Sequence, residues 1–289
     1  MADEPCSVYA PHVTTVGPLP QSLLGEAQAL LAAALPHDPI AVVAEEKLFG
    51  DNGQREGRVF GAWQGSALVG VMATAGRWIK LLAVDGDQRR RGIGTELLGL
   101  ARGDGQLRVM DHPGNYLAPG LDERYREGRA FFAARGFREL GTVENIRAPL
   151  TAALTITDVE GYAIHRVEPA ERASLLGWIA SRFAPVWAFE VARALDGPRR
   201  AVHAAWRAGT PVAFAAADGN NQGLGWFGPA GTDPAHRGRR LGEALLVRCL
   251  EDVRGLPDAG VIAWIGPKMF YAKTVGAVDD RRFVTLEQE

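Results

Sequence analysis

Residues 87–98 read DQRRRGIGTELL, and a similar stretch, AHRGRRLGEALL, stands at residues 235–246. Each stretch places arginines and glycines directly before apolar residues at helical spacing. The N-terminus of a helix already carries partial positive charge, because its first N–H groups have no acceptor within the helix. Arginines at this position are unfavourable unless an anion lies between them. Both stretches therefore predict a turn that binds an anionic ligand.

The residue types in these turns favour a phosphate group as the ligand. Glycine allows a ligand to approach the backbone closely, and the N–H groups at a helix N-terminus converge on one point. Arginine adds planar donors for phosphate oxygens. Neither turn contains GxxxxGK[ST] or GxGxxG, so neither is a Walker loop or a dinucleotide fingerprint. The alternative is a solvated basic turn on an exposed helix, and the recurrence of the pattern argues against it.

The two stretches belong to an internal duplication. Arg89 and Gly94 correspond to Arg237 and Gly242 at an offset of 148 residues. Upstream, VFGAWQG at 59–65 matches VHAAWRAG at 202–209, and downstream FFAARGF at 131–137 matches FYAKTVGA at 270–277. Three landmarks in the same order predict two similar domains. We place them at residues 1–150 and 151–289, packed as a pseudo-dimer within one chain.

Strand-like and helix-like segments alternate in each unit. In the first unit we expect strands at 13–16, 58–64, 67–75, 78–84 and 106–110, and helices at 21–35, 94–102 and 123–135. In the second unit we expect strands at 162–167, 226–229, 261–265 and 281–286, a hairpin at 200–217, and helices at 169–195, from 241 onward and at 268–275. The predicted fold class is α/β (α+β), with a mixed central sheet flanked by helices in each domain.

The composition excludes several classes of function. The chain has 289 residues, 47% of them hydrophobic, and a formal net charge of −2, so no overall basic field would attract nucleic acid. Its two cysteines, Cys6 and Cys249, provide neither a disulfide framework nor metal-ligand spacing. The sequence lacks a signal-peptide pattern and an apolar run of about 18 residues. We therefore expect a cytoplasmic protein with no metal, no nucleic-acid partner and no membrane partner.

A strand followed by [Q/R]-x-x-G-x-[G/A] and a helix resembles the acyl-CoA pyrophosphate motif of the GNAT superfamily of N-acetyltransferases. The motif is complete as RRRGIG at 89–94, whereas RGRRLG at 237–242 has Arg240 where the family prefers glycine. Arg240 is tolerable because any residue except proline offers a backbone N–H. Two copies in matching contexts are similar in layout to tandem, two-domain GNAT proteins.

The resemblance implies direct transfer of an acetyl group from acetyl-CoA to the amine of a small molecule. It also implies which backbone and side-chain groups hold the acyl-CoA. In the first unit these are Leu82, Ala83, Val84, Arg89, Arg90, Arg91, Gly92, Ile93, Gly94 and Thr95. In the second unit they are Gly231, Thr232, Arg237, Gly238, Arg239, Arg240, Leu241 and Gly242.

The family commonly protonates the departing thiolate with a tyrosine, and the matching residue here is Tyr271. The first unit has Phe132 at the equivalent position, which has no proton to donate. We therefore expect the second unit to be the catalyst and the first to bind CoA, with the opposite assignment open. The alternative for Tyr271 is an aromatic ring that only packs its helix.

A non-catalytic acyl-CoA sensor or scaffold remains the alternative function, supported by Phe132 and Arg240. The loop 114–125 lines a substrate groove or covers a sheet edge; the sequence does not decide between them. Glu190 is one acidic candidate for a general base among several. The acceptor amine, the acyl length and the choice between a monomer with pseudo-dimeric domains and a homodimer also stay open.

Overall fold

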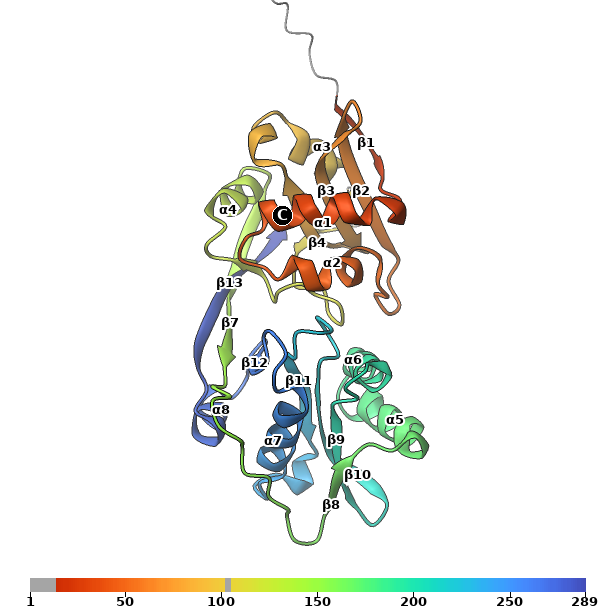
Figure 1. Ribbon diagram of the computed structural model, residues 1–289, viewed down its shortest axis with the longest axis vertical. Helices are drawn as coiled ribbons and strands as arrows, with labels where there is room; N and C mark the ends of the chain where they lie inside the picture. The colour runs from red at the N-terminus through yellow and green to blue at the C-terminus, as the bar shows by residue number, and fades with distance from the viewer. Residues whose placement is uncertain (1–13, 102–104) are drawn as a thin grey trace, which may run out of the picture.

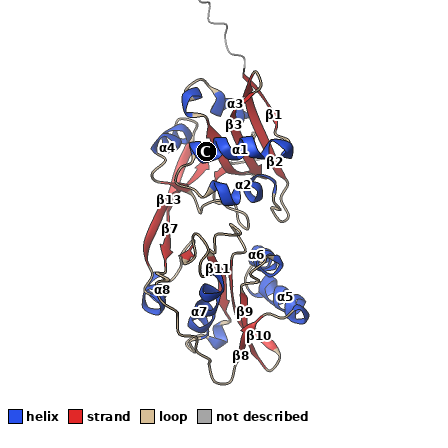
Figure 2. Cartoon of the chain, viewed as in Figure 1, coloured by secondary structure: helices blue, strands red, loops and turns tan. Residues whose placement is uncertain are grey.

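The computed structural model describes residues 14–101 and 105–289. The predictions for Cys6 and for the terminal residues Val13 and Arg102 of two expected elements lie outside this range. All thirteen strands of the described chain form one continuous mixed sheet, which runs through two lobes (Figures 1 and 2). The chain therefore forms a mixed α/β structure, as the alternation of strand and helix patterns predicts.

Within residues 14–101 and 105–147, the first half contributes seven strands and four helices. Its strands are β1 (Thr14–Pro18), β2 (Gly57–Gln64), β3 (Ala67–Ala75), β4 (Trp78–Val84), β5 (Arg108–Val109), β6 (Leu121–Asp122) and β7 (Phe137–Arg147). Its helices are α1 (Leu24–Ala34), α2 (Ile40–Phe49), α3 (Ile93–Gly99) and α4 (Arg126–Ala133). A short 3-10 turn, η2 (Gly86–Gln88), stands before the arginine loop.

The second half repeats this order. Its strands are β8 (Ala163–Arg166), β9 (Val202–Arg207), β10 (Thr210–Ala217), β11 (Phe227–Thr232), β12 (Val261–Ile262) and β13 (Val278–Gln288). Its helices are α5 (Arg172–Arg182), α6 (Pro185–Asp196), α7 (Leu241–Val253) and α8 (Lys268–Val275). The turn η4 (Pro234–His236) occupies the place of η2.

Both halves have the same strand order and the same strand directions. Strands β1 to β5 are consecutive neighbours in the sheet, as are β8 to β12. In each set the first three pairings are antiparallel and the last, β4–β5 or β11–β12, is parallel. The duplication predicted from three short landmarks is thus present in the sheet itself.

The last long strand of each half crosses into the sheet of the other half. The sheet order is β5-β13-β7-β12, so β13 pairs with β5 of the first half and β7 pairs with β12 of the second. Between them, β7 and β13 form an antiparallel ribbon that spans both lobes (Figure 1). The end of the chain is consequently part of the first half's sheet.

The hydrophobic cores reflect this exchange. Phe283, Val284 and Leu286 of β13 are buried with the core of the first half. Ile146 of β7 and Ala148 are buried with the core beneath α7 in the second half. Removing β13 would expose the core of the first half to water, and removing β7 would expose that of the second. Either change would lose the free energy gained by burying apolar side chains.

Some predicted elements differ from the structure. The expected helix at 169–195 is broken into α5 and α6, because the residue before a proline avoids the helical conformation; Ala184, before Pro185, is extended at φ −157°. Strands β5 and β12 are each two residues long, shorter than expected. Helix α2 and strand β7 were not predicted. No helix in residues 14–101 and 105–289 has the length and apolar character to span a membrane.

Candidate active site

In each half, two parallel strands separate shortly after they pair. Strand β4 pairs with β5 only at Trp78 and Ile79. From Lys80 onward, β4 has no strand neighbour on that side among the described residues. In the second half the parallel pairing of β11 is limited to Phe227. Such a fork leaves backbone N–H and C=O groups of the strand available to a ligand.

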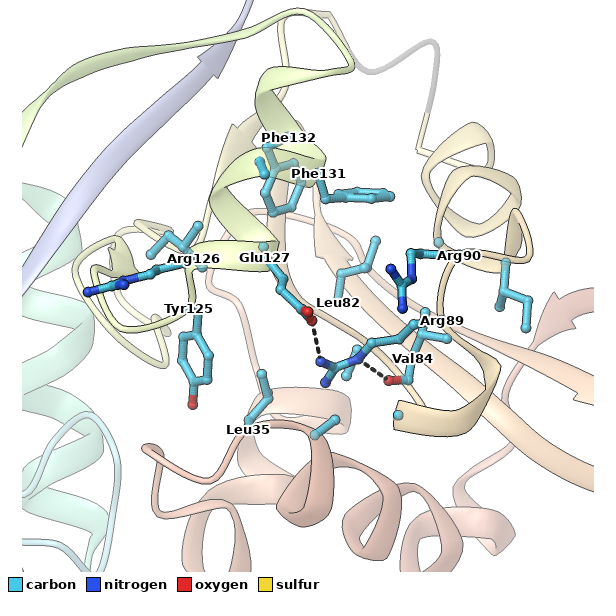
Figure 3. Close-up of a pocket in the computed structure, with 18 of the residues that line it drawn as sticks. Leu35, Leu82, Val84, Arg89, Arg90, Tyr125, Arg126, Glu127, Phe131 and Phe132 are labelled. Carbon is cyan, nitrogen blue, oxygen red and sulfur yellow. Dashed lines mark hydrogen bonds and ion pairs between the residues drawn. The ribbon is translucent and has the colours of Figure 1, made fainter.

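A cavity of about 920 Å³ lies beside β4 in the first half (Figure 3). Its walls are the end of α1, residues 82–84 of β4, the arginine loop and helix α4 with the turn before it. Nine of the ten residues predicted to hold the ligand in this half line it: Leu82, Ala83, Val84, Arg89, Arg90, Gly92, Ile93, Gly94 and Thr95. The sequence motif and the cavity thus coincide.

The arginine loop presents unpaired backbone donors. Arg90 and Gly92 have left-handed backbones, at φ 61° and 89°, and helix α3 begins directly after Gly92. The first backbone hydrogen bond of the helix runs from the Thr95 N–H to the Gly92 carbonyl. The N–H groups of residues 91–94 have no acceptor within the described part of the chain. Unpaired N–H groups at a helix N-terminus are an arrangement that can bind an anion.

The side chains around this loop are cationic. Arg90 and Arg91 are exposed and form no ion pair with any residue that the structure describes. Arg89 Nη1 lies 2.7 Å from Glu127 Oε2 of α4, which connects the loop to the facing helix (Figure 3). Arg135 packs over Phe131, with its Cζ 3.8 Å from the ring centre. The mouth of the cavity therefore attracts negative charge.

Gly94 is needed for the packing of α3 against α4. A Cβ at Gly94 would lie 3.0 Å from Cε2 of Phe131. In the second half a Cβ at Gly242 would lie 3.5 Å from Cζ of Phe270. Phe131 and Phe270 therefore occupy equivalent positions in the two halves. Phe132 is then equivalent to Tyr271, as the sequence comparison predicts.

The second arginine loop follows the same backbone course. Arg89 Nε and Arg237 Nε each lie 3.4 Å from a strand carbonyl, of Val84 and Thr232 respectively. Gly238 and Arg240 are left-handed, at φ 74° and 62°. Arg240 thus adopts the conformation of Gly92 without being glycine, and its guanidinium pairs with Glu243 at 2.6 Å.

An aromatic ring packs over the face of β11 in the second half. Phe183 follows α5 as Leu35 follows α1, and Leu35 lines the first cavity. Phe183 lies so close to Gly231 that a Cβ there would be 2.6 Å from its ring. Phe183 also stacks on Trp187, with ring centres 5.5 Å apart. The predicted contact of Gly231 with a ligand stays a prediction.

Tyr271 is half-buried among aromatic side chains. Its ring lies edge-on to Phe270 and Phe227, at centre distances of 5.0 and 6.2 Å. Burial raises the pKa of its hydroxyl above the usual value. Its hydroxyl has no hydrogen-bond partner in residues 14–101 and 105–289. Both a catalytic role and simple packing fit this environment, so the role of Tyr271 stays a prediction.

The loop 114–125 contacts the second half at one end and the cavity at the other, and its role at a substrate groove stays a prediction. Asn115 and Tyr116 are buried between the halves, where Asn220 Nδ2 donates to the Tyr116 carbonyl at 3.0 Å. Leu121 and Tyr125, at the other end, line the cavity. Tyr125, His37 and Arg281 were not singled out by sequence reasoning, because no local pattern connects them.

The acidic candidate Glu190 lies in α6, buried against residues of the first half, and does not line the first cavity. Burial raises the pKa of its carboxyl to about 7, although Arg193 and Lys47 lower it. Within the described chain, no group of three histidine, cysteine, aspartate or glutamate side chains is placed to hold a metal ion.

Comparison with known proteins gives similarity only at the level of structure. No family model matches the chain, and no curated protein matches it. A tandem GNAT protein from the clavulanic acid biosynthesis pathway has a TM-score of 0.69 and 20% identity, covering 96% of this chain and 98% of its own. A GCN5-related N-acetyltransferase from Sphaerobacter thermophilus has a TM-score of 0.68 and 15% identity, covering 96% of this chain and 95% of its own.

A fungal structure is also similar, with a TM-score of 0.77 and 16% identity. It is described as a GCN5-related glucosamine N-acetyltransferase region in a multi-domain GH3 β-N-acetylglucosaminidase. The match covers 96% of this chain and 38% of the fungal chain. At these identities the likeness establishes the fold, which is that of tandem GNAT acetyltransferases. The sequence resemblance stated from the arginine motifs is confirmed at that level.

Proposed function

We propose that the protein is an acyl-CoA-dependent N-acetyltransferase that transfers an acetyl group from acetyl-CoA to an amine of a small molecule. The observation that carries the proposal is the cavity of the first half, which joins an open strand edge to the unpaired N–H groups of residues 91–94. We assign acetyl-CoA to this cavity. Its volume of about 920 Å³ lies in the range of small-molecule sites.

The residues present fit this ligand. The N–H groups of residues 91–94, with Arg90 and Arg91, provide donors and positive charge for a pyrophosphate. The free edge of β4 from Leu82 to Val84 provides amide partners for a pantetheine arm. Such directed contacts hold the thioester in one position, which lowers the entropic part of the barrier.

Phe132, which lines the cavity, has no proton to donate to the thiolate. In the first half the thiolate therefore leaves without help from a phenol at this position. Tyr271 remains our candidate acid for a reaction in the second half. There, Phe183 packs over the face of β11 at Gly231.

A second candidate function is a non-catalytic acyl-CoA sensor. Phe132 in the first half favours it, because a phenylalanine lacks the hydroxyl that a tyrosine would supply there. Both functions share the acyl-CoA site and differ only in turnover.

Two measurements separate these functions. Titration calorimetry with acetyl-CoA tests binding, and thiol release from acetyl-CoA tests transfer. Glucosamine, putrescine and alanine amide serve as amines of three chemical classes. Binding with amine-dependent thiol release supports the transferase, and binding without release supports the sensor. The absence of binding would contradict both.

A further inference from the structure

Tyr125 lies at the start of α4 and lines the cavity of the first half. Figure 3 shows its hydroxyl near Leu35, on the side of the cavity away from Arg90. The hydroxyl donates a hydrogen bond to Asp38 Oδ2 at 2.8 Å and accepts one from the His37 backbone N–H at 3.1 Å. Its proton is therefore directed at Asp38.

The C-terminal strand holds Asp38 in place. The Asp38 side chain is 1% exposed, and its Oδ1 accepts a hydrogen bond from Arg281 Nη2 of β13 at 2.7 Å. Arg281 Nε also donates to Asp122 Oδ2 at 2.8 Å. Arg281, in the C-terminal strand, thus connects the loop after α1 with the segment before α4. These two segments flank Tyr125.

The charged and titratable groups around Tyr125 are His37, Asp38, Asp122, Arg124 and Arg281. Burial raises the pKa of the Tyr125 hydroxyl, and the charge of Asp38 and the hydrogen bond to it raise it further. The phenol is therefore neutral near pH 7. Because the Tyr125 hydroxyl already donates its hydrogen bond to Asp38, its oxygen can accept another hydrogen bond. The hydroxyl cannot donate a second one to sulfur.

We propose that Tyr125 accepts the proton of the attacking amine and passes its own proton to Asp38, which Arg281 positions. This inference rests on the proposed function. In the step, the amine nitrogen forms a bond to the thioester carbonyl carbon, and the carbon–sulfur bond breaks with its electron pair on sulfur. The amine proton moves to Tyr125 as the phenol proton moves to Asp38. Asp38 later returns its proton to Tyr125 as Tyr125 releases one to solvent, and the thiolate takes its proton from solvent.

The second half has no counterpart of this relay. When FFAARGF is aligned with FYAKTVGA, Tyr125 corresponds to Trp264. When the last residues of helices α1 and α5 are aligned, Asp38 corresponds to Val186. Tyr125 also lies seven residues before Phe132, which is two helical turns away on the same side of α4. The first half thus carries a phenol in its cavity, two helical turns from the position of Phe132.

The test compares Tyr125→Phe and Asp38→Asn with the wild-type protein. Thiol release is measured with glucosamine, putrescine and alanine amide, and also with water, whose attack needs no identified acceptor. We expect each variant to lower kcat/KM for the acceptor about 10²–10³-fold, which is typical of a positioned acid–base group. Affinity for acetyl-CoA should stay within about twofold, and the double variant should lose no more than either single variant.

The pH profile separates chemistry from a structural effect. The ratio of wild-type to variant kcat/KM should fall between pH 7 and pH 9, because hydroxide replaces the relay as proton acceptor. A variant that only distorts the wall of the cavity would lower kcat/KM by the same factor at every pH. It would also bind acetyl-CoA more weakly. Tyr162→Phe, which removes a phenol bonded to His236 Nδ1 at 3.0 Å in the second half, is the matched control and should keep full activity.

The outcomes are distinct. Full turnover in Tyr125→Phe, or a deficit that does not change with pH, overturns the relay and leaves the transferase proposal standing. Binding of acetyl-CoA without turnover in the wild type, with every amine and with water, overturns the relay together with catalysis. No binding at all overturns the proposed function itself.

Discussion

Replacing Gly92 by valine should weaken acetyl-CoA binding about 5- to 30-fold. Gly92 has φ +89°, and a Cβ there meets no atom within 4 Å, so the cost of the substitution arises in the backbone alone. A left-handed conformation costs a residue other than glycine about 1–2 kcal/mol. In the free protein the loop can relax, because the N–H groups of residues 91–94 have no acceptor within the described chain. The ligand must then restore the strained conformation, and its affinity falls by that energy.

Titration calorimetry with acetyl-CoA measures the change. Gly65→Val is the matched control: Gly65 has φ +60° and open space around it, but lies in the β2–β3 turn. Gly65→Val places the same backbone strain away from the cavity, so the affinity for acetyl-CoA should not change. Gly238→Val, at φ +74°, places the same strain in the second loop. An affinity of Gly92→Val within twofold of the Gly65→Val control would refute the reasoning, and a loss confined to Gly238→Val would move the site to the second half.

Three further predictions concern residues outside the first loop. Tyr271→Phe should lower turnover about 10²–10⁴-fold with acetyl-CoA affinity intact if the second half transfers acyl groups; an unchanged rate removes Tyr271 from the mechanism. Burial raises the pKa of Glu190 to about 7, so stability falls as pH rises from about 4.5 to 7; Glu190→Gln should therefore be more stable than wild type at pH 8, by about 1–3 kcal/mol, and equal to it near pH 4.5 in thermal denaturation. Burial alone would raise the pKa of Glu46, but Lys47 and Arg193 bring it down to about 2, so the stability it supplies is present above about pH 4.5 and is lost as pH falls toward 2. Glu46→Gln should lower the free energy of unfolding at pH 7 by about 3–5 kcal/mol in urea denaturation, and a loss below 1 kcal/mol would contradict this.

Local sequence patterns predict much of this fold. The apolar run WIKLLAV predicts β4 at residues 78–84, and the helical segment predicted at 268–275, which overlaps the landmark FYAKTVGA, is helix α8. The repeated arginine motif fixes the register of the two halves, which the Gly94–Phe131 and Gly242–Phe270 contacts reproduce. These features depend on residues close together in the chain, so their signals are readable without a structure.

The remaining features depend on contacts between distant residues. Strands β7 and β13 pair across more than 130 residues, and no local pattern states which half each strand joins. Arg281 reaches Asp38 over 243 residues. The Phe183 ring over Gly231 depends on how α5 packs against the sheet. Tertiary packing decides all three, and a single sequence carries no separate signal for them.

The central claim is that acetyl-CoA binds in the first half with its pyrophosphate at the arginine loop. A crystal structure of the protein soaked with acetyl-CoA tests it most directly. We expect the pyrophosphate within hydrogen-bond distance of the N–H groups of residues 91–94, with the pantetheine arm along residues 82–84 of β4. Density for acetyl-CoA only at residues 238–242, or none in either half at saturating ligand, would contradict the account.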